Sequence, residues 1–233
     1  MKDSVNINGI EVGPSTDIRS LLRSEFLGGS VLAGRYDEGP EAGIRSLVEA
    51  ARGTGLEGRI LAVLKSLLTD TDIRVRAGAV SIVLHYAEKF DPSELLAILD
   101  RNIALYNNVP LPGGNIDLAW ALMRAIAASP TQDAKVAARL RRAVQEPAKG
   151  NWILAGLASN DTEWVIKHPQ EILDDDPARA RIVVFRLGDP NARERFVRGL
   201  PRESPRLRQI VADAVLAEVK DSAEKGRLLR LLA

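Results

Sequence analysis

The stretch LLTDTDIRVRAGAV, residues 67–80, decides the fold class. Two leucines end one apolar segment, Asp70 and Asp72 form a polar turn, and Arg74 and Arg76 alternate with aliphatic residues as the next apolar segment begins. An aspartate before a helix accepts the free N–H groups of the first turn, and an arginine one turn later can reach carbonyl oxygens of the turn. The pattern predicts a junction between two packed helices. We expect its charged residues to serve the scaffold rather than a working site.

The same layout recurs twice toward the C-terminus. Asp189 opens Asp-Pro-Asn-Ala-Arg, which ends at Arg193, and Ser204 opens Ser-Pro-Arg-Leu-Arg, which ends at Arg208. Each copy places a capping residue and two spacers before a small or aliphatic residue and an arginine. Each copy also precedes an apolar helical segment, so the layout predicts repeated helix starts.

This layout resembles the repeats of the HEAT family, in which an acidic turn precedes an aliphatic residue and an arginine at the start of the next helix. The resemblance implies a right-handed α-solenoid in which the arginine bonds back to the turn and links neighbouring repeats. Asp72 and Asp189 lie about three repeats of roughly 40 residues apart, whereas Asp189 and Ser204 are separated by one helix only. The positions that match are Asp70, Asp72, Val75, Arg76, Asp189, Arg193 and Arg208.

Apolar residues from Ser15 onward recur at spacings of three and four, which is the amphipathic helix pattern. Proline and glycine divide this region into about a dozen segments of helix length. We therefore expect an all-α protein, with about five HEAT-like helical pairs in one domain over residues 15–233. Residues 1–14 differ, because apolar and polar residues alternate around Asn8-Gly9, and they predict a hairpin or an extended arm.

The composition limits the classes of partner and compartment. The 32 basic and 31 acidic side chains nearly cancel, so the chain lacks the global field that drives unspecific binding to nucleic acid or anionic membrane. There is no cysteine, which excludes disulfides and thiolate chemistry. No stretch approaches the roughly 20 apolar residues that cross a bilayer. We expect a soluble protein of the cytoplasm that does not engage membranes.

The sequence contains few residues suited to catalysis or to metal binding. Its two histidines are His85, near a predicted helix end, and His168, in a turn before Pro169. The run DDD at 174–176 fits helix capping better than cation binding. No P-loop, dinucleotide fingerprint or hydrolase elbow occurs. We expect no catalytic residue, no cofactor and no metal, although the question of enzymatic activity stays open.

The tryptophans support the alternative of an enzyme. Trp120 is expected in the core, whereas Trp152 and Trp164 stand near helix starts. HEAT-like alkylpurine DNA glycosylases use tryptophan, aspartate and arginine on a concave face, and Asp117 with Trp120 and Asp161 with Trp164 resemble such a set. A DNA-binding array should be strongly basic, which this chain is not. The glycosylase, or another protein that binds nucleic acid, is kept as an alternative.

The region from residue 177 onward is rich in arginine and follows an acidic strip. It predicts either a face for an acidic partner or a solvated surface. Our main hypothesis is a non-enzymatic protein-interaction module of a bacterial cytoplasm, such as an adaptor, an assembly factor or an immunity-type inhibitor. Residues 107–115 can equally serve its binding face or act as a spacer, and LLRLLA at 228–233 leaves self-association open. The candidate partner-binding residues are Arg179, Arg186, Arg193, Arg198, Arg202, Arg206, Trp152 and Trp164.

Overall fold

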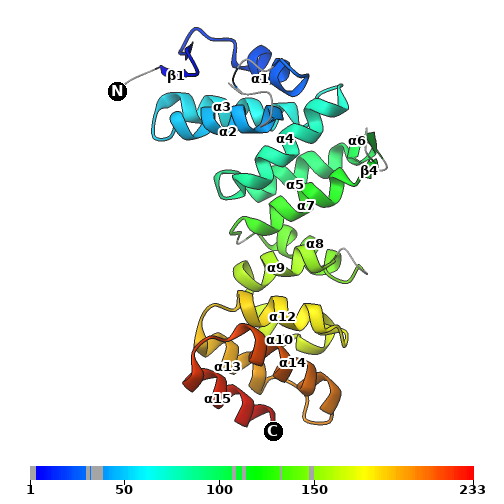
Figure 1. Ribbon diagram of the computed structural model, residues 1–233. Coiled ribbons are helices and arrows are strands. Elements are labelled where there is room, and N and C mark those ends of the chain that lie inside the picture. The colour runs from blue at the N-terminus through cyan, green and yellow to red at the C-terminus, as the bar shows by residue number, and fades with distance from the viewer. Residues whose placement is uncertain are drawn as a thin grey trace. The chain divides into compact units, whose positions relative to one another are not determined.

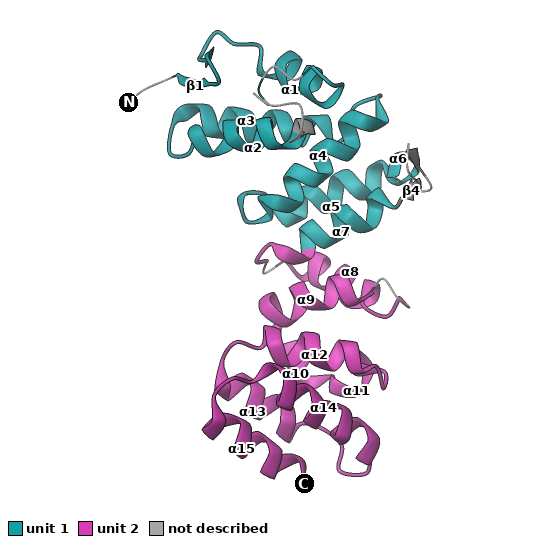
Figure 2. Cartoon of the chain, in the orientation of Figure 1, with its two compact units in different colours: residues 1–126 teal, residues 127–233 magenta. Residues whose placement is uncertain are grey.

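The computed structural model describes residues 4–29, 32, 39–106, 109–111, 114–131, 133–146 and 150–233. The chain divides into two compact units, Met1–Ile126 (unit 1) and Ala127–Ala233 (unit 2), which are coloured separately in Figure 2. Both units are mainly α-helical (Figure 1). The prediction of a mostly helical chain is therefore confirmed.

The helices of unit 1 are α1 (Ile18–Phe26), α2 (Gly39–Ala50), α3 (Gly55–Leu67), α4 (Ile73–His85), α5 (Pro92–Arg101) and α6 (Ile103–Tyr106), with a 3₁₀ turn at Ala87–Lys89. The boundary between the units falls inside α7 (Leu118–Ala128). Unit 2 continues with α8 (Ala134–Ala143), α9 (Gly150–Asn160), α10 (Thr162–Lys167), α11 (Pro169–Leu173), α12 (Pro177–Arg186), α13 (Pro190–Arg198), α14 (Pro205–Glu218) and α15 (Ser222–Leu232).

The described residues contain fifteen α-helices, more than the dozen expected, because α6, α10 and α11 are short. The break between α10 and α11 falls at His168, directly before Pro169. A residue before proline is pushed away from helical backbone angles, which explains the break, and the turn predicted before Pro169 is present.

Aspartates begin many of the helices. The side chains of Asp72, Asp91, Asp133, Asp176 and Asp189 each accept a hydrogen bond from a backbone N–H in the first turn of the helix that follows. Three of these helices, α5, α12 and α13, also carry proline in the first turn, where the missing N–H costs nothing. Asp-Pro pairs thus begin helices at these three sites, and the helix starts predicted at Asp72 and Asp189 are confirmed.

The N-terminal hairpin is present. Strands β1 (Val5–Ile7) and β2 (Ile10–Val12) pair antiparallel, with Val5 opposite Val12 and Ile7 opposite Ile10. Asn8 and Gly9 both have positive φ, 51° and 87°, as the tight turn of a two-residue hairpin requires. Of the two forms predicted for this segment, a hairpin or an extended arm, the structure has the hairpin.

A second hairpin stands where a loop was expected. The predicted loop 107–115 contains the strand β3 (Val109–Leu111), which pairs antiparallel with β4 (Gly114–Ile116), while residues 107, 108, 112 and 113 lie outside the described residues. Pro110 in β3 has no N–H to donate, which a sheet tolerates at its edges, and both strands of a two-stranded sheet are edges. The sequence did not predict this hairpin, because its proline and glycine residues are typical of loops. Its role stays untested.

The core of unit 1 forms where α1, α2, α3 and α4 pack together. Leu22, Ile44, Leu64 and Val83, one from each of these helices, are fully buried. The close approach of α1 and α4 depends on Gly78, because a Cβ at this position would lie 2.2 Å from a ring carbon of Phe26. Glycine is thus required by packing and not by backbone conformation.

Six helices of unit 2 form two sets, and within each set every helix packs against the next. Helix α12 packs against both α9 and α14, and helix α13 packs against both α10 and α15. The two sets are joined by contacts of α9 with α10 and of α14 with α15. We call the first set the α9–α12–α14 row. The helices α9 and α10 thus form a packed pair, as do α14 and α15, and α12 and α13 each contact both pairs.

Several expectations about architecture stay predictions. They are the right-handed solenoid, the count of five pairs and the assignment of residues 15–233 to one domain. Across the described segments, no helix combines the length and the apolar character needed to span a membrane.

Candidate interaction surface

Hydrogen bonds and ion pairs within unit 1 hold the turn between α3 and α4, which contains Asp70 and Asp72. The Asp70 carboxylate, only 6% exposed, accepts a hydrogen bond from Arg23 Nε at 3.1 Å and one from the backbone N–H of Asp72 at 2.9 Å. Arg19 approaches the same carboxylate at 3.7 Å. The carboxylate of Asp72 caps α4 and pairs with Arg74. Both acids are thus occupied by the scaffold.

Arg76 binds the backbone of the same turn. Its Nη1 donates to the carbonyl oxygens of Asp70 and Thr71, at 2.7 and 3.1 Å, and the residue is 7% exposed. The neighbouring Val75 is fully buried. Tyr106 donates its hydroxyl to the carbonyl oxygen of Leu68 at 2.6 Å. Two buried side chains therefore bond carbonyl oxygens here: Tyr106 bonds the one at the end of α3, and Arg76 bonds two in the turn that follows.

The same bond recurs at Arg193. Its Nη1 donates to the carbonyl oxygen of Leu187 at 2.6 Å, while Nε and Nη2 contact the two carboxylate oxygens of Glu224 at 2.6 and 3.1 Å. The Asp189 carboxylate accepts from the first turn of α13. Arg208 instead bonds the carbonyl oxygens of Leu231 and Leu232, at the end of α15. All three arginines thus bind backbone.

The structure corrects the assignment of Arg179 to a binding surface. Arg179 is 5% exposed, and its three nitrogens donate to the Asn151 side chain and to the carbonyl oxygens of Ile172 and Val144, each at 3.0 Å. It links α12 to the turn after α8 and to α9 and α11. The helix start at Asp176-Pro177 was clear from the sequence, but the sequence did not show which face of α12 points inward. Arg179 was therefore placed on the wrong face. Arg193, also a candidate, is similarly engaged by Glu224.

Four candidate arginines are exposed. Arg198 pairs with Glu194 at 2.7 Å, and Arg206 lies 3.5 Å from Asp175. Arg186 and Arg202 have no carboxylate partner within the part of the chain that the structure describes. The exposed candidates do not share one layer of helices, since Arg186 lies on α12 and Arg198 on α13.

The two tryptophan candidates have different surroundings. The Trp152 residue is 49% exposed near the start of α9. The Trp164 ring is half-buried, stacks on His168 with centroids 4.9 Å apart, and has the Arg141 guanidinium 5.4 Å from its centroid. The Asp161 carboxylate is bound to Arg141 at 2.7 Å. Asp161, which stands with Trp164 in the glycosylase-like alternative, is therefore already bound to an arginine.

The other residues considered for catalysis or metal binding also contact groups close to them in the chain. Asp117 accepts a hydrogen bond from the backbone N–H of Trp120, which is half-buried on α7. His85 contacts Tyr86 edge to face at the end of α4, and His168 Nδ1 lies 2.8 Å from the Trp164 carbonyl oxygen. Among the described residues no three His, Asp or Glu side chains gather as a metal site would require. The nucleic-acid alternative stays an untested prediction.

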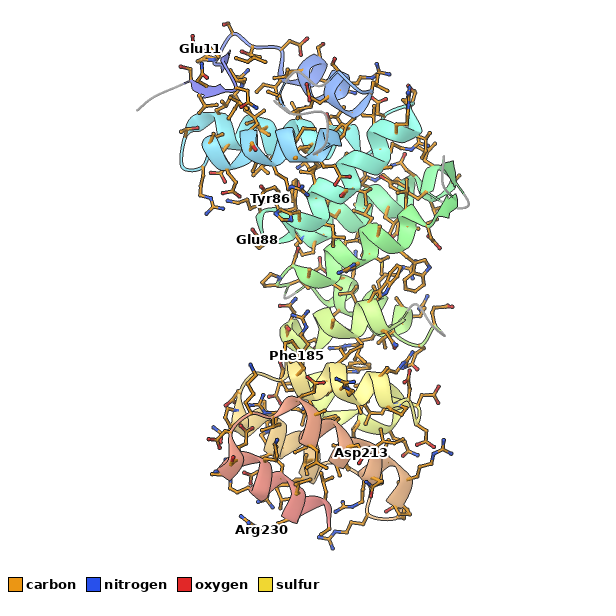
Figure 3. All side chains as sticks on the ribbon, viewed as in Figure 1. Glu11, Tyr86, Glu88, Phe185, Asp213 and Arg230 are labelled. Carbon is orange, nitrogen blue, oxygen red and sulfur yellow. The ribbon has the colours of Figure 1, made fainter. Side chains whose placement is uncertain are left out.

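Large exposed apolar side chains mark the α9–α12–α14 row. The structure has five such residues among those described, and three of them lie one on each helix of the row: Trp152, Phe185 at 58% exposure and Leu216 at 53%. Phe185 is labelled in Figure 3, near the C-terminal end of α12. Sequence reasoning missed Phe185 and Leu216, because each sits within an apolar run that reads as core. The other two, Ile103 and Leu105, lie on α6.

A shallow depression of about 380 Å³ lies where the α9–α10 turn and the α12–α13 turn come together. Ala158, Leu187 and Ala192 form part of its lining and are almost fully buried. Four charged side chains surround them: Glu163, Arg186, Asp189 and Arg195. Bonding to Arg195 lowers the pKa of Glu163 and raises that of Arg195, so both stay charged at neutral pH.

The structure thus shows a mostly helical protein of packed helix pairs, with a large exposed apolar side chain on each helix of the α9–α12–α14 row. The chain matches no protein-family model and no curated protein. The resemblance to HEAT repeats therefore rests on the residues quoted for it.

Proposed function

We propose that this chain is a non-enzymatic protein-interaction module, of the adaptor, assembly-factor or inhibitor kind, and that its α9–α12–α14 row receives another protein. The observation that carries the proposal is the placement of Trp152, Phe185 and Leu216, one on each of three neighbouring helices. Single exposed apolar residues are ordinary on a protein surface, whereas a contiguous apolar patch indicates an interaction site, and we propose that these three residues belong to such a patch.

The energetics favour these side chains as anchors. Covering a large apolar side chain contributes about 1.5–3 kcal/mol, and aromatic residues are enriched among the few residues that dominate binding. The packed pairs α9–α10 and α14–α15, with α12 and α13 between them in sequence and each in contact with both pairs, are consistent with three units of a HEAT-like solenoid, which is the finer architecture that we propose. Arrays of this kind commonly present one layer of helices to a partner.

Site-specific photo-crosslinking tests the proposal. A benzoylphenylalanine is introduced at Trp152 or at Phe185, with Arg198 on α13 as the matched control position on another helix. Each variant is expressed in its native cells, irradiated, and analysed by mass spectrometry with and without nuclease. We expect one protein to be captured at positions 152 and 185, in near-stoichiometric amount, and not at 198.

Two results would overturn the proposal. Capture that is equal at all three positions would mean that the row has no special role. Products that disappear after nuclease treatment would favour the nucleic-acid alternative over a protein partner.

A further inference from the structure

We propose that the depression between the α9–α10 and α12–α13 turns, with Phe185 at its side, binds an acidic peptide segment of the partner. This inference rests on the proposed function, since it names the chemistry of the partner at that surface. An apolar side chain of the segment enters the depression and contacts Phe185, and a carboxylate next to it pairs with Arg186.

The position of Arg186 links the two parts of the site. Its side chain lines the depression, and its guanidinium carbon lies 5.7 Å from the centroid of the Phe185 ring. A guanidinium over an aromatic face keeps its N–H groups free to donate outward, because the contact uses the face of the cation and not its edge. Arg186 therefore presents donors to an incoming carboxylate beside an exposed ring.

The charges around the depression favour an acidic ligand. Glu163 is held by Arg195 through two bonds of 2.6 and 2.8 Å, and the Asp189 carboxylate accepts from the backbone N–H groups of Asn191 and Ala192. Among the described residues, Arg186 has no carboxylate of its own. The formal charges of these four lining side chains sum to zero, but Arg186 is the one among the four whose side chain has no hydrogen-bonded or ion-pair partner in the described part of the chain. Its guanidinium can pair with a carboxylate of the ligand, whereas a lysine or arginine at the same place would be repelled.

The size and the floor of the depression suit side chains of a peptide. Its volume of about 380 Å³ is at the low end of the roughly 300–1,000 Å³ range of small-molecule pockets. Ala158, Leu187 and Ala192 provide a rigid apolar floor, because all three are buried in the helix packing. An apolar floor next to Arg186, which has no carboxylate partner among the described residues, matches a ligand with an apolar residue beside an aspartate or a glutamate.

The test uses two fluorescein-labelled amphipathic peptides. Both have leucines on one helical face, and the other face carries glutamates in the first peptide and lysines in the second. Binding to the full chain is measured by fluorescence anisotropy, for the wild type and for Arg186→Glu, Phe185→Ala and Arg202→Glu. Arg202 is the matched control, since it is exposed, has no carboxylate partner among the described residues, and lies outside the depression.

We expect the glutamate peptide to bind more tightly than the lysine peptide. Arg186→Glu should weaken the glutamate peptide by about tenfold, the effect of losing roughly one charge-assisted hydrogen bond, and should reverse the preference. Phe185→Ala should weaken both peptides, and Arg202→Glu should change neither by more than about twofold. Circular dichroism checks that each variant is folded.

The inference is overturned if neither peptide binds, if both bind equally, or if Arg202→Glu has the same effect as Arg186→Glu. These failures differ from failure of the proposed function. A partner captured at positions 152 and 185 together with peptides that do not bind would retain the interaction module and reject the acidic segment. Absence of any captured protein would reject the module itself.

Discussion

Arg193 donates through Nη1 to the carbonyl oxygen of Leu187, six residues earlier in the chain, over 2.6 Å. Arg76 makes the same bond to Asp70, also six residues earlier, over 2.7 Å. Each arginine is the fourth residue of its helix, and each helix is capped by an aspartate. The capping aspartate and the arginine thus secure both the helix start and the chain that leads into it. The stability of each helix start, and of the turn before it, is therefore expected to depend on the hydrogen bond from the arginine to the backbone carbonyl oxygen.

Replacing Arg193 by methionine should destabilise unit 2. The change leaves Glu224, whose side chain is 6% exposed, without its guanidinium partner, and removal of one member of a buried pair costs about 3–5 kcal/mol. Urea denaturation followed by circular dichroism measures the loss. Arg195→Met on the same helix is the control, because Arg195 and Glu163 are both more than half exposed and such pairs contribute about 0–1 kcal/mol. Equal losses in the two variants would contradict the structural role of Arg193.

Arg179→Met should be destabilising for a related reason. It deprives the carbonyl oxygens of Val144 and Ile172 of their donor, and an unsatisfied buried acceptor costs about 1–3 kcal/mol. The matched control is Arg181→Met, two residues along α12, where the arginine side chain is 61% exposed. We expect the urea midpoint to fall clearly for Arg179→Met and to change little for Arg181→Met. A small effect at Arg179 would mean that water replaces the lost donor.

Sequence analysis predicted the class of fold and the helix starts, because these depend on local signals. Asp72 and Asp189 are recognisable as caps from the residues beside them. It failed where the outcome depends on which side of a helix faces inward. Arg179 was assigned to the surface and is buried, and Phe185, which was not singled out, is exposed. These two lie six residues apart on α12, and their environments differ because Arg179 is bonded to α9, α11 and the turn after α8, whereas the side chain of Phe185 stays exposed.

Gly78→Ala and Gly58→Ala should have opposite effects in unit 1. Alanine is favoured over glycine in a helix interior by about 0.5–1 kcal/mol, and a Cβ at Gly58 on α3 would meet no atom within 4 Å. Gly58→Ala should therefore stabilise. A Cβ at Gly78 would collide with the buried ring of Phe26, and overpacking of this kind costs about 1–3 kcal/mol. Thermal unfolding of the two variants should shift in opposite directions, and a stabilising Gly78→Ala would disprove the close contact of α1 with α4.

Tyr106 should make the protein lose stability at alkaline pH. Burial raises the pKa of its phenol to about 12, above the ordinary value of 10.0, so the folded state keeps the proton over a range in which the unfolded state loses it. The resulting stabilisation is fully present below pH 10 and is lost as the pH rises from about 10 to about 12. The wild type minus Tyr106→Phe difference in unfolding free energy isolates this group, because the other titrations cancel. Over this interval the difference should fall by about 2–3 kcal/mol, since each pKa unit corresponds to about 1.36 kcal/mol.

The variant also removes the donor to the Leu68 carbonyl oxygen, so below pH 10 it should be less stable than the wild type by about 1–3 kcal/mol. A spectrophotometric titration provides an independent readout, because phenolate absorbs in the near ultraviolet. The component that titrates near pH 12 should shrink in Tyr106→Phe, while the burial-raised pKa of Tyr86, also about 12, should leave a remainder. If the difference in free energy stays constant across this range, the Tyr106 hydroxyl is not held in a buried site at the end of α3.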